Sequence, residues 1–348
     1  MHLIIILLII TIYLFYRIYS KGIYSVPNKK EYTIITFVLI LSIGFRGKGV
    51  DNDYEAYVAS INQFLAISEP TFLLIASLIK NFNLPIVTLF IIYAFIGIYY
   101  KMNVIYKNSA LPLVSIIIYL SNIILLQDIN QIRAGAATAL FLISIQYFIE
   151  GRKKLFVLII IIASLFHFSA LLYFSILLID NKKITYRKYL FWIILPLLGY
   201  TFYYIFNQNM IEKIPIEPIR DKLLMYKTLQ SMGSEGFSSI NLFNPYFIFK
   251  LIIYYILMEY YYALYKDNDN ITLYIKIFSI SLFVFPALGA ITPILGYRSS
   301  DLFSCIEILL FPYLFTLFKG EKTKVICIAS YFILLFSINI FYKHLIYI

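Results

Sequence analysis

The chain of 348 residues is 61% hydrophobic and only 14% charged, and no water-soluble fold could bury that much apolar surface. Its apolar runs, such as 3–15 and 155–166, are continuous, which excludes the short alternating segments of a β-barrel. The net charge of +11 does not indicate nucleic-acid binding, because the Lys and Arg residues lie in short clusters between apolar runs. The composition therefore predicts a polytopic helical membrane protein.

We expect an all-α fold in a single integral membrane domain, residues 1–348, with about 11 or 12 hydrophobic segments. The expected segments are 2–19, 32–45, 85–100, 111–126, 132–149, 155–166, 168–179, 189–206, 245–265, 271–295, 302–318 and 324–342. The first has no basic region before it and no small-residue cleavage site after it, so we expect it to be a retained helix.

A short helical hairpin is expected around His167, where segments 155–166 and 168–179 meet. The basic pairs 153–154 and 182–183 share one side of the membrane only if the two segments form such a hairpin. Each arm has about 12 residues, or about 18 Å of helix. His167 would therefore lie within or just below the outer half of the membrane.

Basic residues set the sidedness of the other segments, because Lys and Arg concentrate in cytoplasmic loops. The residues that we expect on the cytoplasmic side are Arg17, Lys21, Lys29, Lys30, Lys101, Lys107, Arg152, Lys153, Lys154, Lys182, Lys183, Arg187, Lys188, Lys266, Lys276, Lys319, Lys322 and Lys324. The residues that the same topology assigns to the external side are Arg46, Asp51, Asp53, Arg133, His167, Arg298 and Asp301. External loops are thus predicted to form a site on one face.

The stretch 45–57 places acidic, basic and aromatic residues directly after a hydrophobic segment. A charge inside the membrane costs about 2.5 to 3.5 kcal/mol on insertion scales, so this stretch is either the lip of a wet cavity or an ordinary solvated loop. Apolar residues at helical spacing from Tyr54, and the short run 71–79, predict two helices on the outer membrane surface, within an external amphipathic loop 46–84. Asp51 or Asp53 would lie near the first helix N-terminus, where a carboxylate is favoured.

Two further polar groups interrupt the apolar segments. In 127–137 a polar turn runs into a helix start rich in Gly and Ala, where Arg133 has room either to bind an anion or to form a helix-packing salt bridge. His167 stands alone between aromatic residues, either as a structural residue or as a base, hydrogen-bond donor or phosphate contact. Three His and two Cys without metal-ligand spacing give no reason to expect zinc, another metal or a cofactor.

The stretch 296–303 restarts the chain at a segment boundary, where Asp301 could cap the next helix. Arg298 is the third arginine expected on the external face, with Arg46 and Arg133. Three guanidinium groups suit a multivalent anion, because each can grip phosphate oxygens in a planar fork. The long external segment 207–244 is either a lid or acceptor loop or a disordered connector.

These residues resemble, in order along the chain, the bacterial O-antigen and exopolysaccharide polymerases of the Wzy and EpsG type. Phe45-Arg46-Gly47, with Val50, Asp53, Tyr54 and Tyr57, is similar to the Arg, Gly, Asp and Tyr pattern after that family's second span. Similar motifs follow in Asn130-Gln131-Ile132-Arg133-Ala134-Gly135, a helix start, in Phe166-His167-Phe168-Ser169-Ala170, a Phe-His-x-Ser-Ala tract, and in Tyr297-Arg298 with Asp301-Leu302-Phe303, a late arginine before an aromatic residue.

The resemblance implies a glycosyltransferase of O-antigen, capsule or exopolysaccharide biosynthesis. It would transfer a glycan from undecaprenyl diphosphate to the terminal sugar of another lipid-linked repeat unit, on the external face of the bacterial cytoplasmic (inner) membrane. Its implied partners are that lipid-linked oligosaccharide and membrane lipid, with a chain-length regulator and other export proteins as candidates. Diphosphate is already a good leaving group, so the protein mainly has to hold its charge and orient the sugar.

On this basis we expect Arg46, Arg133 and Arg298 to hold the diphosphate and Tyr54 or Tyr57 to stack on a sugar. Asp53 or His167 is the expected base for the attacking hydroxyl. Asp51 and Asp301 complete the expected substrate-binding set.

Two other functions stay open at this point. A ligase of similar architecture would use similar arginines to transfer finished glycan to a different acceptor. A flippase or other transporter usually calls for polar residues through the membrane and often for repeated halves. A purely structural membrane subunit would leave the clustered arginines unexplained.

Overall fold

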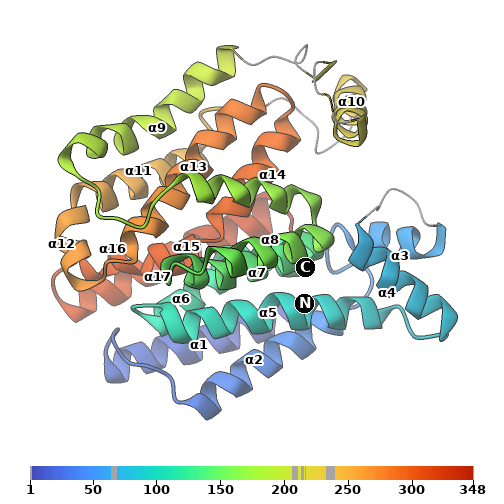
Figure 1. Ribbon diagram of the computed structural model, residues 1–348. Coiled ribbons are helices and arrows are strands. Elements are labelled where there is room, and N and C mark those ends of the chain that lie inside the picture. Colours follow the sequence, from blue (N-terminus) through green and yellow to red (C-terminus); the bar gives the residue numbers. More distant parts are fainter. Residues whose placement is uncertain are drawn as a thin grey trace. The chain divides into compact units, whose positions relative to one another are not determined.

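The computed structural model describes residues 2–63, 69–205, 211–212, 215, 217–232 and 240–347, and it contains no β-strand among them. The all-α class is therefore confirmed. The chain divides into two compact units, Met1–Phe174 with Glu307–Ile348 and Ser175–Ile306 (Figure 1). That all of it is one membrane domain stays a prediction.

Eight helices among the described residues are long and apolar enough to cross a membrane, which confirms a polytopic membrane protein. They are His2–Lys21, Val87–Asn108, Pro112–Asn130, Ile132–Ile149, Tyr186–Ile205, Ile271–Gly289, Pro293–Thr316 and Glu321–Tyr342. A ninth candidate is bent by 70° between α11 (Pro245–Glu259) and α12 (Tyr261–Asp267). The expected segment 245–265 has neither Gly nor Pro near this bend that could have indicated it.

The first unit begins with helices α1 to α8 and the wide helix η1. Their bounds are α1 (His2–Lys21), α2 (Lys29–Gly44), α3 (Tyr54–Gln63), α4 (Pro70–Asn81), α5 (Val87–Asn108), α6 (Pro112–Ile118), η1 (Tyr119–Asn130), α7 (Ile132–Ile149) and α8 (Lys153–Phe166). The chain returns to this unit with α15 (Glu307–Leu310), α16 (Pro312–Thr316), α17 (Glu321–Ser337) and η4 (Ile338–Tyr342). Helix α5 packs between α2 and α7, and α8 packs on the other side of α7 (Figure 1).

Local sequence signals define where several of these helices begin. The side chain of Asn28 accepts from the N–H of Glu31 at 2.9 Å, and the Glu31 carboxylate accepts from the N–H of Asn28 at 3.1 Å, so a capping box starts α2. Pro70 and Pro112 stand in the first turns of α4 and α6, where a missing N–H costs nothing. The run 71–79 is thus a helix of 12 residues, α4, which is too short to span.

The hairpin around His167 is present. Helix α8 ends at Phe166, His167 has extended backbone (φ −155°, ψ 112°), and the tight 3₁₀ helix η2 (Phe168–Leu178) follows. The ring of Tyr173 stacks on Phe141 of α7 at 3.7 Å between centroids, so the chain turns back along α7 after His167. At about 2.0 Å per residue the 3₁₀ arm is about as long as the longer α-helical arm.

The second unit consists of α9 (Tyr186–Ile205), α10 (Glu217–Ser231), α11, α12, α13 (Ile271–Gly289) and α14 (Pro293–Ser304). Helix α13 packs against α9, α11 and α14. The expectation that Asp301 caps a helix is wrong. Helix α14 already begins after Thr292, whose hydroxyl accepts from the N–H of Leu295 at 3.3 Å, so Asp301 lies inside the helix.

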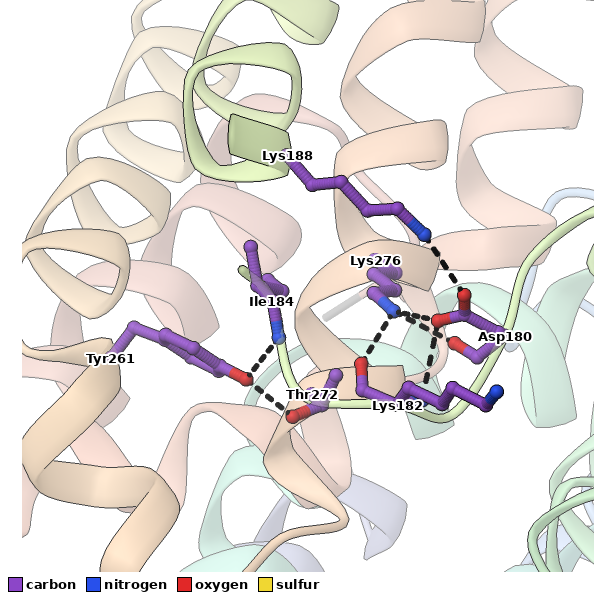
Figure 2. A network of polar contacts seen from close by, with 7 residues as sticks. All are labelled: Asp180, Lys182, Ile184, Lys188, Tyr261, Thr272 and Lys276. Atoms are coloured by element: carbon purple, nitrogen blue, oxygen red, sulfur yellow. Dashed lines mark hydrogen bonds and ion pairs between the residues drawn. The ribbon is translucent and has the colours of Figure 1, made fainter. Parts of the chain in front are cut away.

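The connection between η2 and α9 is tied to α12 and α13 by polar contacts, as Figure 2 shows. The Lys276 ammonium donates to the Asp180 carboxylate at 2.7 Å and to the carbonyl of Lys182 at 3.0 Å, and Lys188 donates to the other Asp180 oxygen at 3.1 Å. The Tyr261 hydroxyl accepts from the N–H of Ile184 at 2.9 Å. Partial burial alone would raise the pKa of Asp180, but the two lysines lower it to about 2.

Parts of the two expected external loops lie outside the described residues. In the loop 46–84 these are residues 64–68, and in 207–244 they are 207–210, 213–214, 216 and 233–239, including Gly233 and Glu235. Helix α10 is the main described part of the second loop. That the segment 207–244 acts as a lid or acceptor loop stays a prediction.

Candidate functional site

The polar stretch 45–57 folds around Arg46. The side chains of Arg46 and Asp51 are both fully buried. The Arg46 Nε–H donates to Asp51 Oδ2 at 2.6 Å, and Nη1–H and Nη2–H donate to the carbonyls of Ile43 at 3.0 Å and Ile129 at 2.7 Å. The guanidinium also lies 4.4 Å from the centre of the Phe90 ring. All three guanidinium nitrogens therefore have internal acceptors, and they tie the end of α2 to the end of η1.

The acidic and aromatic residues after Arg46 pack inward. Asp51 Oδ1 accepts from the N–H of Asp53 at 3.0 Å, and the half-buried Asp53 directly precedes α3. Tyr54 stacks on Phe90 with ring centroids 4.6 Å apart, and Tyr57 is buried in the same apolar cluster. Both tyrosines thus belong to the wall of this cluster.

The segment 344–347 closes the same end of the unit. One of its carbonyls accepts from the side chain of Asn52 at 3.1 Å, and another accepts from the side chain of Asn130 at 2.7 Å. The N–H of Tyr347 donates to the carbonyl of Val50 at 3.0 Å. Residues far apart in the chain therefore hold the loop 46–53 in place.

Two side chains from different elements, Arg133 and His167, contact the carboxylate of Glu69. Arg133 Nη1 lies 2.5 Å from Glu69 Oε2, and His167 Nδ1 lies 3.3 Å from Glu69 Oε1. The Glu69 side chain is 1% exposed and that of His167 is 8% exposed. One buried carboxylate is thus shared by an arginine and a histidine, and we call Glu69, Arg133 and His167 the shared-carboxylate cluster.

The local sequence explains how each element presents its side chain. Glu69 directly precedes Pro70 and stands at the N-cap of α4 without capping it through its side chain. Arg133 is in the first turn of α7, where Gly135 and neighbouring alanines leave space. His167 breaks the helix between the two arms of the hairpin. All three residues therefore lie at helix starts or ends.

The surroundings of Arg133 are aromatic and only partly closed. Its guanidinium lies 5.8 Å from the centre of the Tyr57 ring. The side chain remains 19% exposed, and its buried Nε–H has no hydrogen-bond partner among the described residues. A buried donor of this kind normally has a partner in protein, water or ligand. Arg133 therefore has one donor that no described residue satisfies.

Another buried ion pair of the same unit lies between α5 and η1. Lys101 Nζ donates to both Asp128 oxygens at 2.7 and 2.8 Å, and the Tyr119 hydroxyl donates to Oδ2 at 2.8 Å. The two charged side chains are 0% and 1% exposed. Lys101 lies inside α5, so its expected place at a cytoplasmic helix end is wrong. Asp128 likewise lies within the helical turns of η1, where a polar turn was expected.

The model of the EpsG family matches residues 29–347, a range that includes the shared-carboxylate cluster and every residue expected at the site. The chain belongs to the EpsG family. This family is associated with glycosyltransferase-like polysaccharide polymerases, and its membership gives the chain a polysaccharide-related role in a membrane, with a lipid-linked polysaccharide as substrate. No curated protein and no solved structure matches the chain.

Arg298 and Asp301 of this EpsG-family chain belong to the second unit. Arg298 Nη1 donates to the hydroxyl of Tyr226 on α10 at 3.0 Å, and its guanidinium lies 5.7 Å from the centre of the same ring. The half-buried Asp301 follows one helical turn later. That these two residues share a site with Arg133 stays a prediction.

Sequence reasoning did not identify Glu69 as a candidate site residue. Its one local signal is a carboxylate directly before Pro70, which is also common at surface helix starts. Arg133 and His167 were identified because each interrupts an apolar segment. Their partner lies 64 and 98 residues away in the sequence, so no spacing motif connects the three.

Proposed function

We propose that this EpsG-family protein is a polysaccharide polymerase that transfers a glycan from undecaprenyl diphosphate to the terminal sugar of another lipid-linked repeat unit. The observation that carries the proposal is the shared-carboxylate cluster. It combines a guanidinium that has a donor to spare with a histidine held by a buried carboxylate. Transfer of this kind requires a cation for the leaving diphosphate and a base for the attacking hydroxyl.

The proposed reaction occurs on the external face of the bacterial cytoplasmic membrane. Helices α2 and α8 begin at the basic residues Lys29 and Lys153 and end next to Arg46 and His167, and α7 runs from Arg133 towards Arg152. The basic helix ends are thus opposite to the shared-carboxylate cluster. Because Lys and Arg concentrate in cytoplasmic loops, this distribution supports an external site.

In the proposed reaction the acceptor hydroxyl oxygen forms a bond to the anomeric carbon while the bond from that carbon to the diphosphate oxygen breaks. The electron pair of the broken bond leaves with the diphosphate, and Arg133 balances the negative charge that develops there. The hydroxyl proton passes to His167, with Asp53 as the alternative base from the sequence. Burial strengthens each of these electrostatic interactions, because water screens them less.

The other expected residues receive distinct proposed roles. Arg46 was expected to hold diphosphate, but its donors have internal acceptors, so we assign it with Asp51 to fixing the loop 46–53. Tyr57 lies beside Arg133 in an apolar cluster against which Tyr54 packs, and we propose that this cluster borders the sugar-binding region. Arg298 and Asp301 remain proposed substrate contacts.

The test is product sizing after incubation of purified protein with a lipid-diphosphate-linked repeat unit from its own host. We expect a ladder of polymers from the wild type and none from Arg133→Ala. Arg152→Ala is the matched control, because Arg152 is an exposed arginine at the opposite helix end. Transfer only after addition of a different acceptor would indicate a ligase, and no transfer at all would leave the transporter function.

A further inference from the structure

The Glu69 carboxylate contacts both the proposed diphosphate-binding residue Arg133 and the proposed base His167. Once a diphosphate is bound, these two interactions have opposite effects. Glu69 Oε2 neutralises Arg133 at 2.5 Å, and its Oε1 faces His167 Nδ1 at 3.3 Å. A diphosphate at Arg133 would bring a second, larger negative charge to the same guanidinium. Glu69 then competes with the ligand on one side and supports the base on the other.

We propose that Glu69 is a positioning residue that couples diphosphate binding at Arg133 to activation of the base at His167. This inference rests on the proposed polymerase function. Without a ligand, Arg133 is the main counter-ion of Glu69, because their atoms are closer and Arg133 is always charged. The diphosphate draws Arg133 into charge-assisted hydrogen bonds of its own. Glu69 then interacts more strongly with His167 Nδ1.

Glu69 acts on His167 in two ways. A carboxylate beside Nδ1 favours the tautomer that carries its proton on that nitrogen, which puts the lone pair on Nε2. As Nε2 takes the proton of the acceptor hydroxyl, the imidazole becomes a cation, and the nearby carboxylate stabilises it. Glu69 itself neither receives that proton nor contacts the reacting atoms. Donor binding thus prepares the base before the acceptor reacts.

A merely structural salt bridge predicts a different result, and the variant Glu69→Gln separates the two. Coupling predicts that loss of the competing charge lowers the KM for the lipid-linked donor about tenfold. It also predicts that kcat falls about 100-fold, because His167 loses its carboxylate. A structural role predicts loss of folded protein, with KM unchanged or raised. A raised KM with folded Glu69→Gln would overturn the coupling.

Two further variants serve as controls. Glu69→Asp keeps the charge but is one methylene shorter, so we expect a KM close to the wild type and a partial recovery of kcat. Glu55→Gln removes an exposed carboxylate of the same loop, which lies 3.4 Å from Lys48 and is 56% exposed. We expect both kinetic parameters of Glu55→Gln to match the wild type. A similar KM decrease in Glu55→Gln would attribute the effect to general charge and not to Glu69.

A binding measurement separates failure of the coupling from failure of the proposed function. The probe is farnesyl diphosphate, titrated into purified protein in detergent and followed by calorimetry. We expect wild-type binding, tighter binding by Glu69→Gln and at least tenfold weaker binding by Arg133→Gln. No binding by the wild type would overturn the diphosphate site and the proposed function together. Binding that depends on Arg133 but weakens in Glu69→Gln would overturn the coupling alone.

If Glu69→Gln does not fold, His167→Asn decides the question with the same probe. Binding coupling is reciprocal, so removal of the group that draws Glu69 away from Arg133 must weaken diphosphate binding, by about three- to tenfold. Unchanged binding by folded His167→Asn would overturn the inference.

Discussion

Two of the buried ion pairs in the first unit differ in how completely their charged groups are enclosed. In one pair, Lys101 bonds both oxygens of Asp128, Tyr119 bonds one of them again, and neither charge is reached by solvent. In the other pair, Arg133 is 19% exposed, and its Nε–H has no partner among the described residues. The first pair is complete by itself, whereas the second is the pair that we propose binds the diphosphate.

Packing accentuates this difference. A Cβ added at Gly97 or Gly135 would lie 2.3 or 2.8 Å from Asp128 Oδ1, so two glycines allow backbones to enclose the closed pair. Gly135 lies only two residues after Arg133. The closed pair therefore anchors the helix turn from which Arg133 reaches Glu69. A buried charge alone does not mark a functional site, so our proposal rests on the incomplete set of partners of Arg133.

The largest expected effect comes from breaking the closed pair. Lys101→Met leaves Asp128 buried without its cation, and we expect the free energy of unfolding to fall by about 3 to 5 kcal/mol. The double variant Lys101→Met with Asp128→Leu removes both charges and should recover most of the loss. Chemical unfolding in detergent measures both.

Lys48→Met is the control for this comparison, because Lys48 forms an exposed pair with Glu55. We expect its unfolding free energy to stay close to that of the wild type. A double variant as unstable as the single variant would mean that the Lys101 side chain, and not its charge, is what α5 needs.

A substitution in the Arg133–Glu69 pair should lower activity and leave stability almost unchanged. Arg133→Lys keeps a cation near Glu69 but loses the planar fork that can hold phosphate oxygens together with Glu69. We expect kcat/KM to fall about 100-fold, or about 2.7 kcal/mol of transition-state stabilisation, while the melting temperature changes little. Arg152→Lys provides the comparison at an exposed site. An equally large loss of melting temperature would show that Arg133 is structural.

Substitution of a glycine next to the Lys101–Asp128 pair should have an intermediate effect on stability. Gly135→Ala brings a methyl group to 2.8 Å from both Asp128 Oδ1 and the carbonyl of Gln127, so the helices must shift. We expect a loss of about 1 to 3 kcal/mol in unfolding free energy, which thermal unfolding in detergent would detect. Gly47→Ala has no atom within 4 Å of its new Cβ and should be neutral in packing. Equal stability of the two variants would contradict the close packing around Asp128.

The sequence predicted a polytopic all-α membrane protein, because hydropathy summed over about 20 residues depends little on tertiary context. Three of the twelve expected segments, 32–45, 155–166 and 168–179, match neither the eight helices that are long and apolar enough to span nor the bent ninth candidate. The sequence also identified Arg133 and His167, since a polar side chain in an apolar run is conspicuous. It did not show that the Arg46 guanidinium donates hydrogen bonds to two backbone carbonyls, because every residue has a carbonyl and a sequence pattern cannot indicate which one accepts. It assigned Lys101 to the cytoplasmic side of the membrane because this residue lies near the end of an expected segment. The buried partner of Lys101 became visible only when α5 and η1 were packed together.

The smallest expected effect concerns an ion pair of a third kind, in the connection before α9. Asp180 is held by Lys276 and Lys188, but its side chain is 39% exposed, so solvent weakens the interaction. Its pKa is about 2 in the folded protein, below the ordinary value of 3.8. The unfolded chain therefore binds the proton more readily. The stabilisation is complete above about pH 4 and is lost as the pH falls towards 2.

After allowance for solvent screening, we expect this contribution to be less than about 1 kcal/mol. The measurement is thermal unfolding of wild type and Asp180→Asn in detergent at pH 5, 3.5 and 2.5. The wild-type advantage should shrink across this range, and added salt should reduce it at pH 5, because screening acts on exposed pairs. An advantage that persists at pH 2.5 and in high salt would mean that Asp180 is shielded from solvent like Asp128, and that its exposure does not weaken the ion pair.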